Sequence, residues 1–286
     1  MSQPFELIGV LGGGQMGSGI AQVSAAAGLS VVVVDKNDNN LARARTYIER
    51  SLGRLVTKKS LTPEEHDATL ARISFSRLVA DFAPCDIIVE AVTENRTLKH
   101  HVFRELDSVA KPGAVLASNT SSLSITELGG VTRRSDRVVG MHFMNPVPMM
   151  QLVEIIRGIG TSDETFDAVV AFAQRVGKTT VAAQDYPGFI VNRILIPMIN
   201  EAAFALMENV GTVDDIDTAM KLGANHPLGP LALGDLIGLD VCVAIMDTLH
   251  NAMGDPKYRA CPLLRRYVAA GWLGRKSGRG FYVYPR

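Results

Sequence analysis

The part of this chain that most constrains its fold is the first 35 residues. A short apolar run, Phe5 to Leu11, leads directly into Gly12-Gly13-Gly14-Gln15-Met16-Gly17, a G-x-G-x-x-G motif. The residues after it predict a helix that ends at Gly28, and a second apolar, β-branched run ends in Asp35. A strand, a glycine turn, a helix, a strand and an acid in this order predict a dinucleotide-binding βαβ unit.

Each glycine of the motif has a physical reason. Gly12 permits the tight turn, Gly14 has no Cβ and lets a pyrophosphate approach the backbone, and Gly17 lets the helix pack close to the strand. The unpaired N–H groups and the positive dipole end at the helix start then bind phosphate. We therefore expect the cofactor to be held by Gly12, Gly14, Gln15, Met16 and Gly17.

Asp35 indicates which dinucleotide binds. It lies 18 residues after Gly17, at the predicted end of the second strand. A carboxylate there accepts hydrogen bonds from the adenosine ribose and repels a 2′-phosphate, which favours NAD over NADP. The basic neighbour Lys36 leaves the strictness of this preference open.

Length and composition exclude several classes of protein. A chain of 286 residues predicts about two domains. Its 29 basic and 29 acidic residues balance, so no overall charge favours nucleic acid or an anionic membrane. The most apolar late stretch, residues 228 to 246, contains two aspartates and predicts a core helix rather than a membrane span. The three cysteines are scattered and no signal peptide is visible, so we expect a cytoplasmic protein without a metal site.

The rest of the chain predicts two domains of different kinds. Residues 1–186 predict an α/β domain, a Rossmann-type doubly wound sheet that holds the cofactor, and residues 187–286 predict an all-α domain with helices near 189–209, 212–223 and 231–253. An antiparallel helical hairpin is expected between the second and third strands, up to about residue 71. After the first two strands, six short apolar runs predict the others, at 73–76, 86–90, 114–117, 137–143, 152–156 and 179–183.

The first helix of the hairpin is strongly basic. Arg43, Arg50, Arg54 and Lys58 are among its cations. Such a helix is either a solvated surface or one wall of a groove for a phosphorylated substrate. Spacing alone favours the solvated surface.

A histidine and a glutamate are the candidate pair for proton transfer. Of six histidines, only His142 lies at the carboxyl end of a predicted strand, and Glu154 follows twelve residues later on the next strand. A strand, a turn and a strand of that length can return Glu154 to the side of His142, where a carboxylate fixes the tautomer of the imidazole and stabilises its protonated form. The alternative, a core histidine and a solvent-facing glutamate, stays open at this point.

Two further polar positions face the predicted cleft. Ser121 belongs to a hydroxyl-rich run, 118–122, at the end of a strand, and Asn192 lies in the first turn of the helix that opens the second domain. Either could contact substrate. The alternative for the serine run is helix capping, because Ser124 and Glu127 have capping-box spacing.

Motifs along nearly the whole chain carry a family resemblance. GGGQMGSGIAQ, EAVTEN, SNTSSL, HFMNPVP, LVEI, PGFIVNR, DIDTAMKLG and GRKSGRGFY span residues 9 to 284. With them the chain resembles the short-chain 3-hydroxyacyl-CoA dehydrogenases, and among these the bacterial 3-hydroxybutyryl-CoA dehydrogenases. The resemblance implies oxidation of (S)-3-hydroxyacyl-CoA by NAD, the reverse reduction, and a homodimer formed through the C-terminal domain.

The resemblance also implies residue roles. His142 matches the general base and Glu154 its orienting partner, while Ser121 and Asn192 match groups that face the substrate. One departure is Met144, where the family commonly has a second phenylalanine. NAD contacts are implied for Asp35, Glu94, Lys99, Ser121, Asn145 and Lys276, and CoA contacts on the basic arm for Ser51 and Lys58, which reverses the preference from spacing there.

Two alternatives remain at this level. The first is a related dehydrogenase of a free hydroxy acid such as gulonate, which would need no CoA contact at Ser51 and Lys58. The second is a non-catalytic NADH-binding protein. The presence of His142 and Glu154 together argues against the second.

Overall fold

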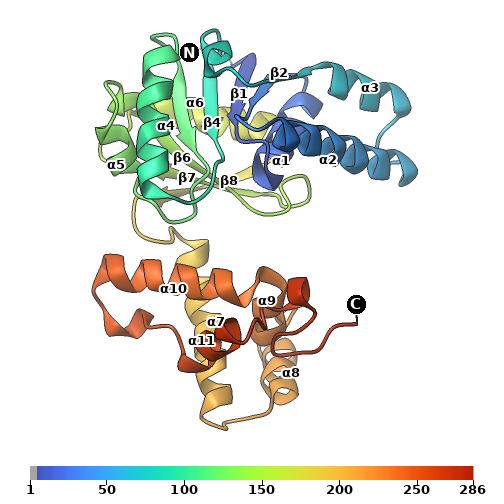
Figure 1. Ribbon diagram of the computed structural model, residues 1–286, viewed down its shortest axis with the longest axis vertical. Helices are drawn as coiled ribbons and strands as arrows, with labels where there is room; N and C mark the ends of the chain where they lie inside the picture. The colour runs from blue at the N-terminus through green and yellow to red at the C-terminus, as the bar shows by residue number, and fades with distance from the viewer. Residues whose placement is uncertain (1–4, 286) are drawn as a thin grey trace. The chain divides into compact units, whose positions relative to one another are not determined.

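The computed structural model describes residues 5 to 285, and the chain divides into two compact units between Tyr186 and Pro187. The first unit is a sheet with helices on its faces, and the second consists of helices (Figure 1). This is the α/β fold with a helical C-terminal region that the sequence predicts. Within the described residues, no helix combines the length and apolar character needed to cross a bilayer.

The sheet of the first unit has eight strands in the order β3-β2-β1-β4-β5-β6-β7-β8. All neighbours are parallel except β6 and β7, which form an antiparallel pair. The chain order reverses beside β1, which is the point where doubly wound sheets bind ligands. All eight predicted strands are present: β1 (Leu7–Leu11), β2 (Ser30–Val34), β3 (Ile73–Ser76), β4 (Ile87–Glu90), β5 (Val115–Ser118), β6 (Val138–Phe143), β7 (Leu152–Arg157) and β8 (Thr179–Gln184).

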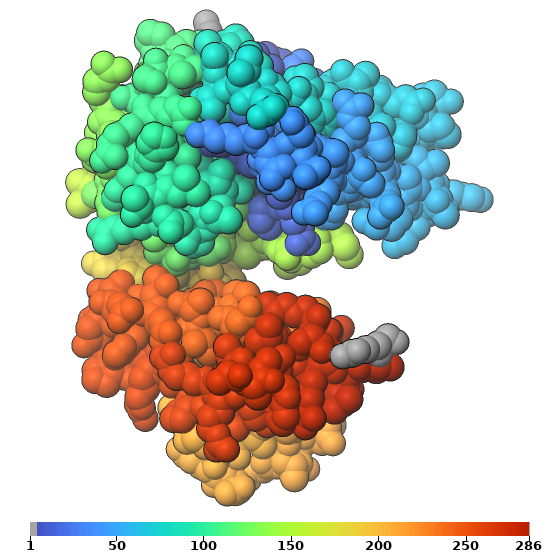
Figure 2. All heavy atoms as spheres, viewed as in Figure 1, coloured from blue at the N-terminus to red at the C-terminus, as the bar shows by residue number. Residues whose placement is uncertain are grey.

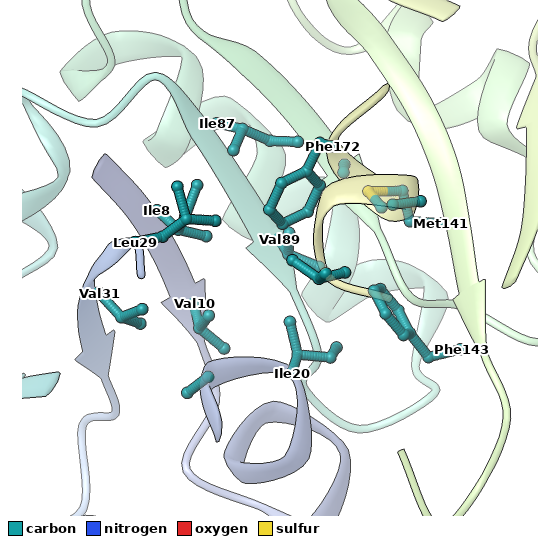
Figure 3. Close-up of a cluster of buried hydrophobic side chains, with 14 of the residues drawn as sticks. Ile8, Val10, Ile20, Leu29, Val31, Ile87, Val89, Met141, Phe143 and Phe172 are labelled. Atoms are coloured by element: carbon teal, nitrogen blue, oxygen red, sulfur yellow. The ribbon is translucent and has the colours of Figure 1, made fainter. Parts of the chain in front are cut away.

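Helices cover both faces of this sheet. On one face Ile20 of α1 and Phe172 of α6 belong to the same buried cluster as Val10 and Val89 of the sheet (Figure 3). On the other face α5 packs on β6 and α4 on β5. The central strands are buried on both faces, which explains their nearly continuous apolar sequences. The helices are α1 (Gln15–Ala26), α2 (Asp38–Thr57), α3 (Pro63–Ala71), α4 (Arg96–Val109), α5 (Ile125–Gly130) and α6 (Asp163–Arg175).

The predicted hairpin insertion is the pair α2 and α3, which pack against each other (Figure 1). Thr62 caps α3 through a reciprocal pair of hydrogen bonds with Glu65, and Pro63 takes the first helical position. The two helices form an arm beside the sheet, with α2 also packed against α1.

The second unit differs from the prediction in two places. The helix expected over 231–253 is two helices, because Gly238 adopts φ +108° and ends the first of them. The helix α11 was not predicted. Burial raises the pKa of Asp235, whose carboxylate accepts from the backbone N–H groups of Phe281 and Tyr282 and so fixes the C-terminal segment. The helices are α7 (Val191–Met207), α8 (Val213–Gly223), α9 (Pro230–Ile237), α10 (Leu239–Met253) and α11 (Pro262–Ala269).

Candidate active site

The glycine loop between β1 and α1 is shaped by close contacts on one side and open on the other. Gly12 has φ +114°, a conformation that side chains rarely adopt. A Cβ at Gly17 would lie 1.9 Å from the carbonyl oxygen of Gly12, so the helix could not approach the strand with any other residue. A Cβ at Gly14 would meet nothing within 4 Å. The loop therefore leaves room at Gly14 and the first N–H groups of α1, as a pyrophosphate requires.

A cavity of about 330 Å³ lies beside this loop, and its lining includes Gly14, Asp35, Val92 and Leu98. The Asp35 carboxylate accepts a hydrogen bond of 2.8 Å from the backbone N–H of Gly13, which fixes it at the edge of the cavity. Mostly apolar walls with the fixed Asp35 carboxylate at the edge suit an adenosine, whose base would pack on the walls while its ribose hydroxyls donate to the acid.

The His142 and Glu154 side chains meet across the antiparallel pair of β6 and β7. The two residues are directly opposite in the register, and His142 Nδ1 lies 2.6 Å from Glu154 Oε2. Both are buried, with 5% and 0% of their surface exposed. Met141 and Phe143, which flank His142, belong to the apolar cluster under α1 and α6, as do Val153 and Ile155, which flank Glu154. His142 and Glu154 therefore point to the opposite face of the sheet.

The loop after β5 is organised by Glu94. One carboxylate oxygen, Oε1, accepts from the hydroxyl of Thr120 (2.5 Å), the N–H of Ser121 (3.0 Å), and both the N–H and the hydroxyl of Ser122. Asn119 accepts from the N–H of Phe143 at 2.9 Å and ties the same loop to the end of β6. Ser121, the predicted substrate contact, is thus held between the ends of β4 and β6.

The loop after β6 contains Asn145 and is anchored by a buried lysine. Lys178 Nζ donates to the carbonyl oxygens of Val147 (2.6 Å) and Met150 (2.8 Å). Burial lowers the pKa of Lys178 below its ordinary value. The lysine therefore fixes the loop that places Asn145.

The remaining predicted contacts lie elsewhere in the chain. Asn192 is the second residue of α7, and Lys276 pairs with Asp240 at 2.5 Å; both belong to the second unit. On the arm, Lys58 is exposed at the C-terminal end of α2, but only 8% of Ser51 is exposed. Within residues 5–285, no group of three or more His, Cys, Asp or Glu side chains is placed to hold a metal ion.

Comparison with known families decides what this arrangement belongs to. The family model described as "3-hydroxyacyl-CoA dehydrogenase, NAD binding domain" matches residues 7–186, and the model of the C-terminal domain of the same family matches residues 188–284. The chain belongs to the 3-hydroxyacyl-CoA dehydrogenase family. It is an NAD-dependent oxidoreductase, and NAD is its cofactor.

Relatives match over nearly their full lengths. A probable 3-hydroxybutyryl-CoA dehydrogenase of Deinococcus radiodurans is 54% identical over 276 residues, 96% of this chain and 99% of that protein. The mitochondrial hydroxyacyl-coenzyme A dehydrogenase of Rattus norvegicus is 44% identical over 282 residues, 96% of this chain and 90% of that protein. The solved (S)-3-hydroxybutyryl-CoA dehydrogenase of Ralstonia eutropha has 49% identity and a TM-score of 0.96, and the match covers 99% of this chain and 100% of that one.

In this member of the 3-hydroxyacyl-CoA dehydrogenase family, the structure also adds a polar group that the sequence did not single out. Glu90, the last residue of β4, is fully buried, and it contacts both Lys99 and Ser118. In the sequence it ends an ordinary apolar run. The sequence feature that could have identified Glu90 is a glutamate at the last position of a buried strand.

Proposed function

We propose that the protein oxidises (S)-3-hydroxyacyl-CoA, in particular 3-hydroxybutyryl-CoA, to 3-oxoacyl-CoA with NAD, and that it also runs the reverse reduction. The observation that carries this proposal is the buried contact of 2.6 Å between His142 and Glu154 on adjacent strands of the family's NAD-binding domain. Relatives with the name 3-hydroxybutyryl-CoA dehydrogenase match nearly the whole chain and support the choice of substrate.

The contact between His142 and Glu154 determines which nitrogen of the imidazole takes the proton from the substrate. Glu154 accepts the Nδ1–H of His142, and in this tautomer the Nε2 lone pair is the base that takes the proton of the substrate's 3-hydroxyl. The carboxylate then stabilises the imidazolium, which returns its proton to the 3-oxo oxygen in the reverse direction. When bound, NAD supplies the hydride acceptor for C3. We assign to Ser121 and Asn192 the task of holding the substrate oxygen by hydrogen bonds.

The cofactor site is proposed from the same geometry. The room at Gly14 and the start of α1 suit the pyrophosphate, and the cavity beside Asp35 suits the adenosine. Around the nicotinamide half we place Glu94, Ser121 and Asn145, and the family resemblance implies a further NAD contact for Lys276.

An assay with purified protein tests the proposed function. NADH oxidation should be fast with acetoacetyl-CoA and near background with free acetoacetate. Longer 3-oxoacyl-CoA substrates in the same assay measure the preference for acyl-chain length. Gulonate with NAD should also give no turnover. Comparable kcat/KM for a free acid and its CoA thioester would favour the alternative, a dehydrogenase of free hydroxy acids.

Replacing Asp35 with alanine should change the cofactor preference. We expect the Kd for NAD to rise by about tenfold to a hundredfold, because the ribose loses a charge-assisted acceptor. The Kd for NADP should change little, because the repulsion of its 2′-phosphate is lost as well. The reduced forms NADH and NADPH have the same adenosine halves, so fluorescence titration with them measures both changes in affinity.

The contact between Asp35 and the N–H of Gly13 requires a control for that test, because Asp35→Ala also loosens the loop. Asp35→Asn keeps a side-chain oxygen that can accept from Gly13 but removes the charge, and it should also narrow the preference for NADH over NADPH. Equal losses of affinity for both cofactors in the two variants would contradict the ribose role.

The basic face of α2 supports recognition of the CoA phosphates. Figure 2 shows the arm, in blue to light blue, at the surface of the first unit. A cavity of about 420 Å³ is lined by Tyr47 and by the guanidinium-bearing Arg43, Arg50 and Arg54. Among the described residues, none of these three arginines pairs with a carboxylate. We infer that, together with Lys58, they bind the phosphates of CoA, a use for which unpaired guanidinium groups are suited.

Replacing Arg54 with alanine should raise the KM for acetoacetyl-CoA while leaving kcat nearly unchanged. We expect about a fivefold to tenfold increase, since an exposed charge pair with phosphate contributes modestly. The KM of the wild-type enzyme should rise with salt more steeply than that of the variant. Arg45→Ala is the matched control, because Arg45 stacks on Phe75 instead of lining this cavity. Equal KM values for the wild type and the Arg54 variant at low salt would refute this placement of CoA.

We also infer that the protein is a homodimer formed through the helical unit. This unit exposes large apolar side chains, including Ile194 (66%), Val210 (75%) and Leu222 (82%). Exposure of such side chains to water is unfavourable, and a partner subunit would cover them. Light scattering should give twice the chain mass of 30.8 kDa. A mass of one chain at micromolar concentration would contradict the dimer.

A further inference from the structure

Three charged side chains line the cavity beside the glycine loop. Asp35 and Lys36 directly follow β2, and Glu105 belongs to α4. Lys36 is therefore the one cation in the described lining, and it is the neighbour of the carboxylate that we assign to the adenosine ribose. A cation at this place bears on the choice of cofactor, because Rossmann domains that bind NADP use a nearby basic side chain, an arginine, to accommodate the 2′-phosphate.

The Asp35 carboxylate is held by three nitrogen donors. Its Oδ2 accepts from the N–H of Gly13 at 2.8 Å, its Oδ1 accepts from the N–H of Asn37 at 2.9 Å, and the side-chain amide of Asn40 donates to both oxygens at 3.2 Å. These donors come from the glycine loop, the turn after β2 and the first turn of α2. The carboxylate is thus fixed at the edge of the cavity, where its charge repels a phosphate on the neighbouring ribose hydroxyl.

Lys36 pairs with Glu105 and not with its sequence neighbour Asp35. Its Nζ lies 3.6 Å from Glu105 Oε2, and within residues 5–285 the ammonium group makes no other ion pair. The side chains of Lys36 and Glu105 are 68% and 32% exposed. An exposed pair of this kind contributes little to stability. It nevertheless gives the ammonium group a counter-charge, with which a second anion has to compete.

Glu105 faces the cavity because of its place on α4. Leu98, Val102 and Glu105 follow one another at spacings of four and three residues, so they share one face of the helix. All three line the cavity. The apolar part of this face suits the adenine, and its last member brings a negative charge to the same cavity.

We propose that Glu105 is a specificity-determining residue that strengthens the preference for NAD over NADP. It pairs with Lys36 and so withholds this cation from a 2′-phosphate, while Asp35 repels the phosphate directly. The inference rests on the proposed function for the position of the adenosine. It also addresses the strictness of the preference, which Lys36 leaves open in the sequence.

Replacing Glu105 with glutamine tests this role. The readouts are the Kd for NAD and the Kd for NADP, each measured without substrate by displacement of fluorescent NADH, because the two ligands differ only in the 2′-phosphate. We expect the Kd for NADP to fall by about threefold to fivefold, as for the release of an exposed ion pair, and the Kd for NAD to stay within about twofold. The gain for NADP should shrink at high salt. An unchanged Kd for NADP would overturn the proposal.

A double-mutant cycle shows whether Glu105 acts through Lys36. Lys36→Gln alone should change the Kd for NADP by less than about twofold, because the wild type already withholds this cation. In the Lys36→Gln background, Glu105→Gln should no longer improve NADP binding by more than about twofold. A full gain in the double variant would show that Glu105 repels the phosphate itself, and it would contradict a role through Lys36.

The matched control is Asp38→Asn. It also removes one negative charge close to β2 and releases a cation, Arg77, but neither residue belongs to the described lining of the cavity. Its Kd for NADP should stay within about twofold of the wild type. An equal gain in this variant would identify net charge as the cause and would overturn the proposal. Absence of acyl-CoA turnover in the wild type would refute the proposed function, whereas the preference between NAD and NADP would still be measurable.

Discussion

Replacing His142 with glutamine should lower kcat for acetoacetyl-CoA reduction by on the order of a thousandfold, within the range that a lost general acid–base group costs. Glutamine retains an N–H that can donate to Glu154, so the buried carboxylate keeps a partner, but it has no group that titrates near neutral pH. The Kd for NADH should stay within about twofold, because binding energy made outside the reacting centre is unaffected. Steady-state kinetics and fluorescence titration measure the two quantities.

The control for this variant is a second histidine in the same unit. His101 is exposed on α4, and His101→Gln should leave both kcat and NADH affinity unchanged. Circular dichroism and thermal unfolding establish that both variants are folded. If His142→Gln kept kcat within about tenfold of wild type, the imidazole would not be the base, since general acid–base catalysis contributes more than that.

The sheet was predictable because burial on both faces leaves a simple signal. Strands such as 87–90 (IIVE) and 115–118 (VLAS) are short apolar runs bounded by polar residues, and their polar last residues mark the carboxyl edge. The same logic predicted that His142 and Glu154 emerge on neighbouring strands. Which face they share depends on the register of the pair, and the register is visible only in the folded chain.

Contacts between distant elements were not predictable from spacing. Glu90 and Lys99 are nine residues apart, but their ion pair depends on how α4 packs on the sheet. The break at Gly238 was missed for a related reason: a glycine within a helical pattern is tolerated in many helices, and only packing decides whether it ends one. The CoA contact of Ser51 came from the family resemblance alone; the structure leaves 8% of this residue exposed, and the contact stays a prediction.

Replacing Glu154 with glutamine should have the second largest effect, a loss of kcat on the order of a hundredfold to ten-thousandfold. The amide is isosteric with the carboxylate, so packing is kept. It brings no charge to stabilise the imidazolium, and its N–H₂ can donate to Nδ1 and leave the proton on Nε2, where the substrate needs a lone pair. Because β6 and β7 hold residues 142 and 154 directly opposite each other, we expect the amide to lie beside Nδ1 as the carboxylate does in the wild type.

The pair should act as a unit. We expect kcat of the double variant His142→Gln with Glu154→Gln to lie within about threefold of kcat of the slower single variant, as for other catalytic groups that share one proton. Glu154→Asp keeps the charge but lengthens the contact of 2.6 Å, and it should recover part of the activity lost in Glu154→Gln. Losses that multiply in the double variant, together with no recovery in Glu154→Asp, would mean that Glu154 stabilises the sheet and does not orient the base.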